Sequence, residues 1–212
     1  MRLNFLPTKS GRRASRLFAL LARAAFRLKE SNSDSSWGAP AKLFHWLVAG
    51  LIFAQFWLGW LAASWRLSPT KLNLFVWHKS LGMVILALVL VRLLWRLANP
   101  TPALPADTPV WERAVARLSH ALLYVVMIAM PITGWINNSA AGVPFSIFWW
   151  IPLPPLVSPD KHTAELAALA HFSLFIVFVA LLVVHVGAAL RHHFVKRDNV
   201  LTRMLPARRT PK

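Results

Sequence analysis

The sequence predicts an all-α protein, an integral membrane four-helix up-and-down bundle with both termini in the cytoplasm. Of its 212 residues, 57% are hydrophobic, only 15% are charged and eleven are tryptophan. Several apolar runs approach the length of about 20 residues that a helix needs to cross a bilayer. A soluble domain of this size would carry more charge and shorter apolar runs.

Each apolar run predicts one membrane-spanning helix. The runs cover residues 43–63, 74–94, 114–136 and 164–194. The first ends before a short polar loop, and the second ends where Arg92 and Arg96 approach a proline-rich, non-helical segment. Segment 137–162 has the centre FSIFWWIPLPPL, which is too short and too rich in proline for a fifth span. Its aromatic residues suit the membrane–water interface.

Three regions are expected along the chain. Residues 1–41 form a basic cytoplasmic extension, residues 42–196 the transmembrane domain and residues 197–212 a basic cytoplasmic tail. The polar run SNSDSS at residues 31–36 predicts that the extension is flexible. Residues 16–29 have some helical amphipathicity and could lie on an anionic leaflet.

The placement of Lys and Arg predicts the orientation. Nine precede the first span, four lie around the loop between the second and third spans, and seven follow Leu190, whereas four lie on the other side. Because cytoplasmic segments carry the excess of positive charge, both termini should face the cytoplasm. The net charge of +17 therefore lies in tails and alternate loops, without a basic globular domain, which argues against nucleic-acid binding.

The chain contains no cysteine. This excludes disulfides, thiolate zinc sites, cysteine-ligated iron–sulfur clusters and haem attached through a C-x-x-C-H motif. Metal chemistry must then depend on the eight histidines and the few carboxylates.

His171 and His185 lie fourteen residues apart in the last span. A helix turns through about 1400° over that distance, roughly 40° less than four turns, so both imidazoles project from nearly one face. Their Cα atoms are about 21 Å apart along the axis. In the predicted orientation His78 shares the outer depth with His171, and His45 shares the inner depth with His185. The sequence thus predicts two bis-imidazole sites between facing helices.

These histidines could make ordinary interhelical hydrogen bonds, bind zinc or bind haem. Ionisable groups inside a membrane are costly and usually functional, which favours a cofactor over hydrogen bonds alone. Zinc needs three or four ligands, and the spans carry no Asp or Glu near these depths. Two axial nitrogens suit haem iron, and they leave no open position on it for a substrate. We therefore expect electron transfer rather than substrate activation.

Seven segments carry a resemblance to a known family. They are FHW (44–46), WHKSLG (77–82), VRLLWRLANPTP (91–102), LSHALLY (118–124), MPITGW (130–135), PLPPLVSPDK (152–161) and VHVGAALRHHFVKRDNVLTRMLP (184–206). In this combination the chain resembles a bacterial cytochrome b561, a family related to the cytochrome b subunits of nickel–iron hydrogenases and formate dehydrogenases. The resemblance runs from about residue 42 to the C-terminus, and the long basic extension departs from it.

The resemblance implies a multi-pass protein of the bacterial inner (plasma) membrane with two non-covalent haem b groups. The family's ligands fall on the four histidines that depth selects: His45, His78, His171 and His185. Lys79, beside His78, is expected to be a propionate partner, whereas Arg66, Lys71 and Lys161 are interpreted mainly as ordinary loop charges.

Two more histidines have open roles. His120 lies at about the depth of His45 and could ligate the inner haem, or could hydrogen-bond to a propionate or a neighbouring helix. His192 follows His185 by seven residues on nearly the same face and could exchange protons with a quinone. The alternative for His192 is a cation favoured by the helix C-terminus. Resemblance to a superoxide-oxidising family member supports the quinone interpretation.

Three functions are consistent with this pattern. The first is a transmembrane electron carrier that exchanges electrons with the quinone pool, ubiquinone being a possible substrate. The second is a superoxide:ubiquinone oxidoreductase, with superoxide oxidised at the outer haem. The third is a haem-bearing membrane subunit for a dehydrogenase or another periplasmic electron donor or acceptor. The short first outer loop offers little docking surface, which disfavours an obligate large partner.

Overall fold

The computed structural model describes residues 32–33 and 36–206. Most of the predicted flexible extension, residues 1–31 and 34–35, lies outside this description, as do residues 207–212 of the predicted basic tail.

In the described part of the chain, four long helices form a bundle: α2 (Ala39–Ser64), α3 (Pro69–Ala98), α4 (Val110–Ala140) and α5 (Lys161–Arg191). Each is long and apolar enough to cross a membrane, and within the described residues there is no fifth such helix. The four predicted spans are confirmed. The helices extend past the predicted limits where polar residues start them: Ser68 caps α3 by accepting the Lys71 N–H, and Asp160 caps α5 through the Thr163 N–H.

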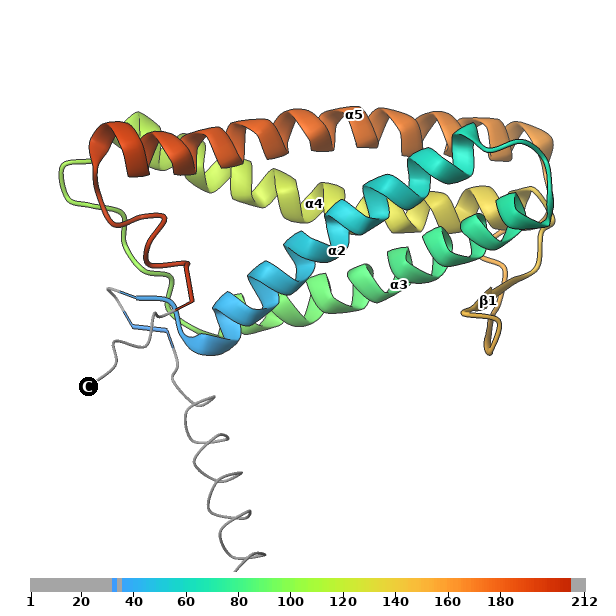
Figure 1. The fold of residues 1–212 in the computed structure, drawn as a ribbon, viewed down its shortest axis with the longest axis horizontal. Helices are drawn as coiled ribbons and strands as arrows, with labels where there is room; N and C mark the ends of the chain where they lie inside the picture. Colours follow the sequence, from blue (N-terminus) through green and yellow to red (C-terminus); the bar gives the residue numbers. More distant parts are fainter. Residues whose placement is uncertain (1–31, 34–35, 207–212) are drawn as a thin grey trace, which may run out of the picture.

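The bundle consists of two helical hairpins. α2 packs against α3, α4 packs against α5, and the hairpins meet mainly along α3 and α4. All four helices follow one long axis, with α2 inclined across the others (Figure 1). The side between α2 and α5 is bridged by side chains such as Phe56 and Phe175, whose ring centroids are 5.6 Å apart.

The buried core lies midway along the bundle. It contains residues from all four helices: Val48, Ile85, Val89, Leu123, Tyr124, Val126, Met127 and Phe178. Phe178 lies seven residues from both His171 and His185 on α5. The apolar core therefore separates two levels of histidines.

A small hairpin lies between α4 and α5. Its strands, β1 (Phe145–Ile147) and β2 (Ile151–Leu153), pair antiparallel, and it projects sideways near one end of the bundle (Figure 1). Phe148 and Trp149 at its turn have positive φ angles of 46° and 66°. The sequence predicted an interfacial loop here without strands, because the prolines around β2 hide the strand pattern.

The described residues before α2 and after α5 lie at the same end of the bundle. Trp46 Nε1 donates to the Met204 carbonyl at 2.8 Å, and Arg203 donates to the Ala103 carbonyl at 2.7 Å. This agrees with an even number of spans. The assignment of this end to the cytoplasm stays a prediction.

Candidate functional site

Four of the predicted histidines meet as two pairs at two levels of the bundle. His78 on α3 faces His171 on α5 with ring centroids 6.3 Å apart, and His45 on α2 faces His185 on α5 at 6.2 Å. All four side chains are half-buried. These are the pairings that helical depth predicts.

At the outer pair, each imidazole lies against a glycine of the neighbouring helix. A Cβ atom added at Gly59 would be 2.9 Å from His78 Cε1, and one at Gly134 would be 3.2 Å from His171 Cε1. The first distance is shorter than any normal carbon–carbon contact. The His78 ring therefore occupies space that a glycine at position 59 leaves open, and a side chain at Gly134 would press against the His171 ring.

Hydrogen bonds orient the outer rings differently. His171 Nδ1 donates to the Met130 carbonyl at 2.9 Å, so the neutral ring keeps a lone pair on Nε2. Gln55 Nε2 donates to the His78 carbonyl at 2.8 Å and lies 3.4 Å from His78 Nε2. His78 Nδ1 and Gln55 Oε1 are buried without hydrogen-bond partners. The outer site thus contains a buried imidazole nitrogen and a buried amide oxygen that no protein group satisfies.

The inner pair belongs to a cluster of three histidines. His120 on α4 lies 5.3 Å from His185 between ring centroids, closer than His45 does. Arg92 Nη2 donates to His45 Nδ1 at 2.9 Å, because a guanidinium has no acceptor atom. The neutral His45 ring therefore carries its proton on Nε2 in this arrangement.

This donor set fits haem better than a bare metal ion. A bond of about 2 Å from each nitrogen to a central metal, added to the size of the rings, places the centroids roughly 6 Å apart. Both pairs have that spacing. Within the described part of the chain, no group of three or more His, Cys, Asp or Glu side chains is suited to hold an ion by itself. A group that brings its own equatorial ligands needs only the two imidazoles.

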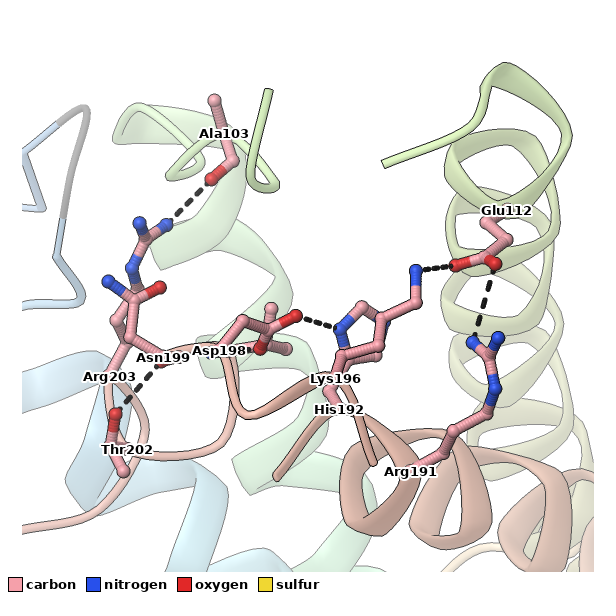
Figure 2. A network of polar contacts seen from close by, with 10 residues as sticks. Ala103, Glu112, Arg191, His192, Lys196, Asp198, Asn199, Thr202 and Arg203 are labelled. Carbon is pink, nitrogen blue, oxygen red and sulfur yellow. Dashed lines mark hydrogen bonds and ion pairs between the residues drawn. The ribbon is translucent and has the colours of Figure 1, made fainter. Parts of the chain in front are cut away.

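His192 lies at the inner end, where α5 passes into the π-helix η1 (His192–Lys196). Arg197 then adopts a left-handed conformation with φ 55°, which turns the chain back so that Asp198 reaches the imidazole. His192 Nδ1 and Asp198 Oδ2 are 2.5 Å apart (Figure 2). Nδ1 is thus engaged, which leaves Nε2 as the nitrogen that could meet a substrate.

The Asp198 carboxyl has a lowered pKa. Partial burial raises it, but the hydrogen bonds from His192 and from the Val200 N–H, together with the charges of His192 and Lys196, more than offset that effect. Asp198 is therefore ionised at neutral pH and accepts the hydrogen bond from His192 Nδ1. Nearby, Glu112 on α4 accepts from both Arg191 and Lys196, which ties η1 to α4 (Figure 2).

The three lysines predicted for the outer side contact protein groups. Lys79 Nζ donates to Asn138 Oδ1 at 2.8 Å and lies 5.2 Å from the centre of the Phe145 ring. Lys71 donates to two carbonyls at the end of α2, and Lys161 makes an exposed ion pair with Glu165. A propionate contact of Lys79 stays a prediction.

Several residues around the histidines were not predicted from the sequence to belong to the site: Gln55, Gly59, Gly134, Tyr124 and Asp198. For Gln55 there was a signal, since one amide stood alone in an otherwise apolar run. Gly59 carried no such signal, because its role depends on which ring lies opposite.

A membrane helix bundle with facing histidine pairs at two levels has the architecture of a membrane cytochrome. The family model described as prokaryotic cytochrome b561 matches residues 36–207. The chain therefore belongs to the prokaryotic cytochrome b561 family, a family of membrane electron-transfer proteins that carry b-type haem.

Three relatives with curated names are similar over most of their length. Cytochrome b561 homolog 2 of Escherichia coli (strain K12) is 34% identical over 182 residues, which is 82% of this chain and 94% of that protein. Cytochrome b561 homolog 1 of the same organism is 29% identical over 169 residues, 78% of this chain and 94% of the relative. Probable superoxide oxidase CybB of Yersinia pestis is 30% identical over 169 residues, 78% of this chain and 93% of the relative. Family membership and the four spans identify a multi-pass protein of the bacterial inner membrane.

Proposed function

We propose that this protein moves electrons across the membrane through two b-type haems and exchanges them with the quinone pool on the cytoplasmic side. His78 and His171 hold the outer haem, and His45 and His185 hold the inner one. Each haem, when bound, supplies one-electron iron chemistry with both axial positions filled. The protein's task is to hold and orient the two groups and to exclude water.

One observation carries the proposal: the imidazole centroids of both pairs are 6.2 and 6.3 Å apart, at two levels separated by an apolar core. Three of these histidines hydrogen-bond to a neighbouring helix, but the two rings of each pair are not hydrogen-bonded to each other, so those bonds do not account for the spacing within the pairs. The two ring planes of the pairs are tilted by 56° and 77°.

His192 is the residue that we assign to quinone chemistry. Reduction of a quinone to a quinol consumes two electrons and two protons, so the site needs a group that exchanges protons near neutral pH. His192 is half-buried, lies about two turns beyond His185 at the end of α5, and is held through Nδ1 by Asp198. Its Nε2 can then give a proton to a quinone oxygen.

Haem counting tests the haem assignment. Purified protein should contain two haems per chain by the pyridine haemochrome method. His171→Ala should lose the outer haem and His185→Ala the inner one, each keeping the other. If neither variant loses a haem, the pairing is refuted.

His120→Ala is the matched variant at the inner site. Because His45 and His185 already supply two axial nitrogens, it should retain both haems. Loss of one haem from His120→Ala, with retention in His45→Ala, would show that His120 is the inner ligand instead.

A second candidate function is oxidation of superoxide with ubiquinone as electron acceptor. The relative named probable superoxide oxidase CybB, 30% identical over 169 residues, favours it. Superoxide would deliver one electron at the outer haem, and dioxygen would leave. The test mixes oxidised protein with superoxide or with ubiquinol and follows the haem absorption bands. Fast reduction by superoxide alone supports this function, and reduction by quinol alone favours a carrier of quinol electrons.

A further inference from the structure

Two arginines of α3 turn into the bundle beside the inner histidines. The guanidinium carbons of Arg92 and Arg96 lie 5.6 and 5.7 Å from the centre of the Tyr124 ring on α4. Arg92 also contacts His45 on α2 at 2.9 Å. The three residues Arg92, Arg96 and Tyr124, called here the arginine–tyrosine cluster, therefore lie at the inner site itself.

The arginine–tyrosine cluster has an excess of positive charge. Neither guanidinium forms an ion pair with Asp or Glu among the described residues. Of the acidic side chains at the same end, Glu112 already binds Arg191 and Lys196, Asp198 binds His192, and Asp107 is exposed in a loop. Two unpaired positive charges within a membrane-spanning helix are costly, so a partner of negative charge is expected.

The Tyr124 hydroxyl also lacks a partner at this site. Tyr124 is only 8% exposed, and its hydroxyl is buried without a hydrogen-bond partner. A buried hydroxyl that makes no hydrogen bond costs about 1–3 kcal/mol. The two guanidinium groups and the Tyr124 hydroxyl can all donate hydrogen bonds. Within the described structure, no acceptor near them satisfies all three groups.

Snorkelling to the lipid headgroups does not account for these arginines. A snorkelling side chain extends along its helix toward water and stays exposed. Arg92 and Arg96 are instead half-buried, lie against an aromatic ring of α4 and, in the case of Arg92, bind a histidine of α2. Their charge is directed inward.

We propose that the arginine–tyrosine cluster binds carboxylates, namely the two propionates of the haem held by His45 and His185. This rests on the proposed function. Two guanidinium groups match two carboxylates in charge, and arginine binds a carboxylate through two parallel hydrogen bonds. The Tyr124 hydroxyl gains the acceptor that it lacks.

Binding of a propionate to Arg92 also prepares His45 as a ligand. While Arg92 donates to Nδ1, the His45 proton is held on Nε2, the nitrogen that faces a metal in most histidine sites. A carboxylate is the stronger acceptor for a guanidinium, so a propionate draws Arg92 away. Nδ1 can then take the proton, and Nε2 is left with its lone pair. Arg92 thus couples binding of the carboxylates to the tautomer of His45.

The test compares haem b with its dimethyl ester, in which both propionates are neutral. Full-length protein is loaded with either form in vesicles of phosphatidylcholine, and release of each haem to excess apomyoglobin is timed. Wild-type protein should release the esterified inner haem about tenfold to a hundredfold faster than the free acid, as expected for lost charge-assisted hydrogen bonds. In Arg92→Gln/Arg96→Gln both forms should leave at the same rate.

Further variants separate this role from a structural one. Arg92→Lys keeps the charge and should retain most of the ester effect, and Tyr124→Phe should reduce it. Arg113→Gln, on the neighbouring α4 helix, is the matched control and should behave as wild type. Loss of positive charge near the iron favours its ferric form, so Arg92→Gln should also lower the midpoint potential of the inner haem and leave that of the outer haem unchanged.

Each contrary result has a distinct meaning. The inference is overturned if wild-type protein holds the ester as tightly as the free acid, or if the double variant keeps the ester effect. It is also overturned if the arginine variants matter only in vesicles containing phosphatidylglycerol, because the cluster would then bind lipid headgroups. If wild-type protein binds no haem of either form, the proposed function itself fails.

Discussion

The position of a ligand histidine in this bundle is set by the residue opposite it. His78 lies so close to α2 that even one methyl group at Gly59 would touch its ring, whereas Gly50 and Gly187 face open space. Gly59 and Gly50 belong to the same helix, so they provide a comparison in which helix propensity is equal and only the neighbouring ring differs.

Gly59→Ala should perturb the outer haem alone. The added Cβ would be 2.9 Å from His78 Cε1, so the ring or the helix must shift, at a cost of about 1–3 kcal/mol. We expect a changed outer-haem spectrum or loss of that haem, with the inner haem unaffected. Gly50→Ala is the control and should be neutral or stabilise α2 by up to about 1 kcal/mol. Equal spectra for both variants would contradict the tight contact.

The histidines of the site could be predicted from the sequence, whereas the residues that surround them could not. Helical spacing and depth predict which imidazoles share a level, since both follow from chain position. The partners Gln55 and Gly59 depend on how α2 is rotated against α3, and the apolar pattern of a membrane helix leaves that rotation open. Arg92 was counted as a loop charge for the same reason, although it lies six residues before the end of α3.

At the scale of elements, the end of α5 shows how a short segment can position a functional side chain. The π-helix η1 and the left-handed Arg197 place the Asp198 carboxylate on His192, and the Asp198 N–H returns to the His192 carbonyl at 3.1 Å. The turn is thus closed by both backbone and side chain.

Protection of this turn should depend on pH. The Asp198 pKa is lower in the folded protein than in an unfolded chain, so its contribution to stability is present above the ordinary pKa of about 3.9 and is lost as pH falls through the folded value. The hydrogen-exchange protection factors of residues 192–206, corrected for the intrinsic exchange rate at each pH, should therefore fall on acidification through that range. Asp198→Asn should remove about 1.5–3 kcal/mol of local stability at neutral pH and abolish this dependence.

Asp107→Asn is the control for that measurement, because Asp107 is exposed in a loop of the same end. It should leave the exchange of residues 192–206 unchanged. A pH dependence that persists in Asp198→Asn would assign the effect to another group.

The β1–β2 hairpin depends on one buried hydroxyl of α3. Ser80 has no exposed surface and accepts the Phe148 N–H at 2.8 Å. Ser80→Ala should leave that N–H unpaired, destabilising the hairpin by about 1–3 kcal/mol and exposing it to proteases while the helices stay folded. Ser158→Ala, in the exposed loop before α5, should have no such effect. Equal cleavage of both variants would show that the contacts of the Trp77 ring with Phe148 and Trp149 are enough to hold the hairpin in place.

The helices were predictable as elements and this hairpin was not. A single run of about twenty apolar residues satisfies its backbone hydrogen bonds within a bilayer by forming a helix. A nine-residue hairpin with a proline in its second strand has no comparable signal, and Ser80 and Trp77 hold it against α3.

For the whole molecule, the positive charge predicts that the end carrying residues 197–206 faces the cytoplasm. Because the chain has no cysteine, single replacements can test this without background labelling. In intact spheroplasts a membrane-impermeant maleimide should label Ser158→Cys at once and Thr202→Cys only after permeabilisation. The reverse pattern would invert the bundle and exchange the assignments of inner and outer haem.

The architecture was predictable because length, apolarity and charge asymmetry act on the whole chain at once. The two hairpins and the inclination of α2 were not, since they result from close packing at particular small residues such as Gly59 and Gly82. Topology follows from composition, whereas the packing of the helices follows from individual contacts.

The union of the two helical hairpins along α3 and α4 bears on how such a protein matures. The edge between α2 and α5 is bridged by side-chain contacts such as that of Phe56 with Phe175, and it can part without separating the helices of either hairpin. A flat, hydrophobic prosthetic group dissolved in the bilayer can then reach its histidine ligands laterally, between α2 and α5, without passing through water.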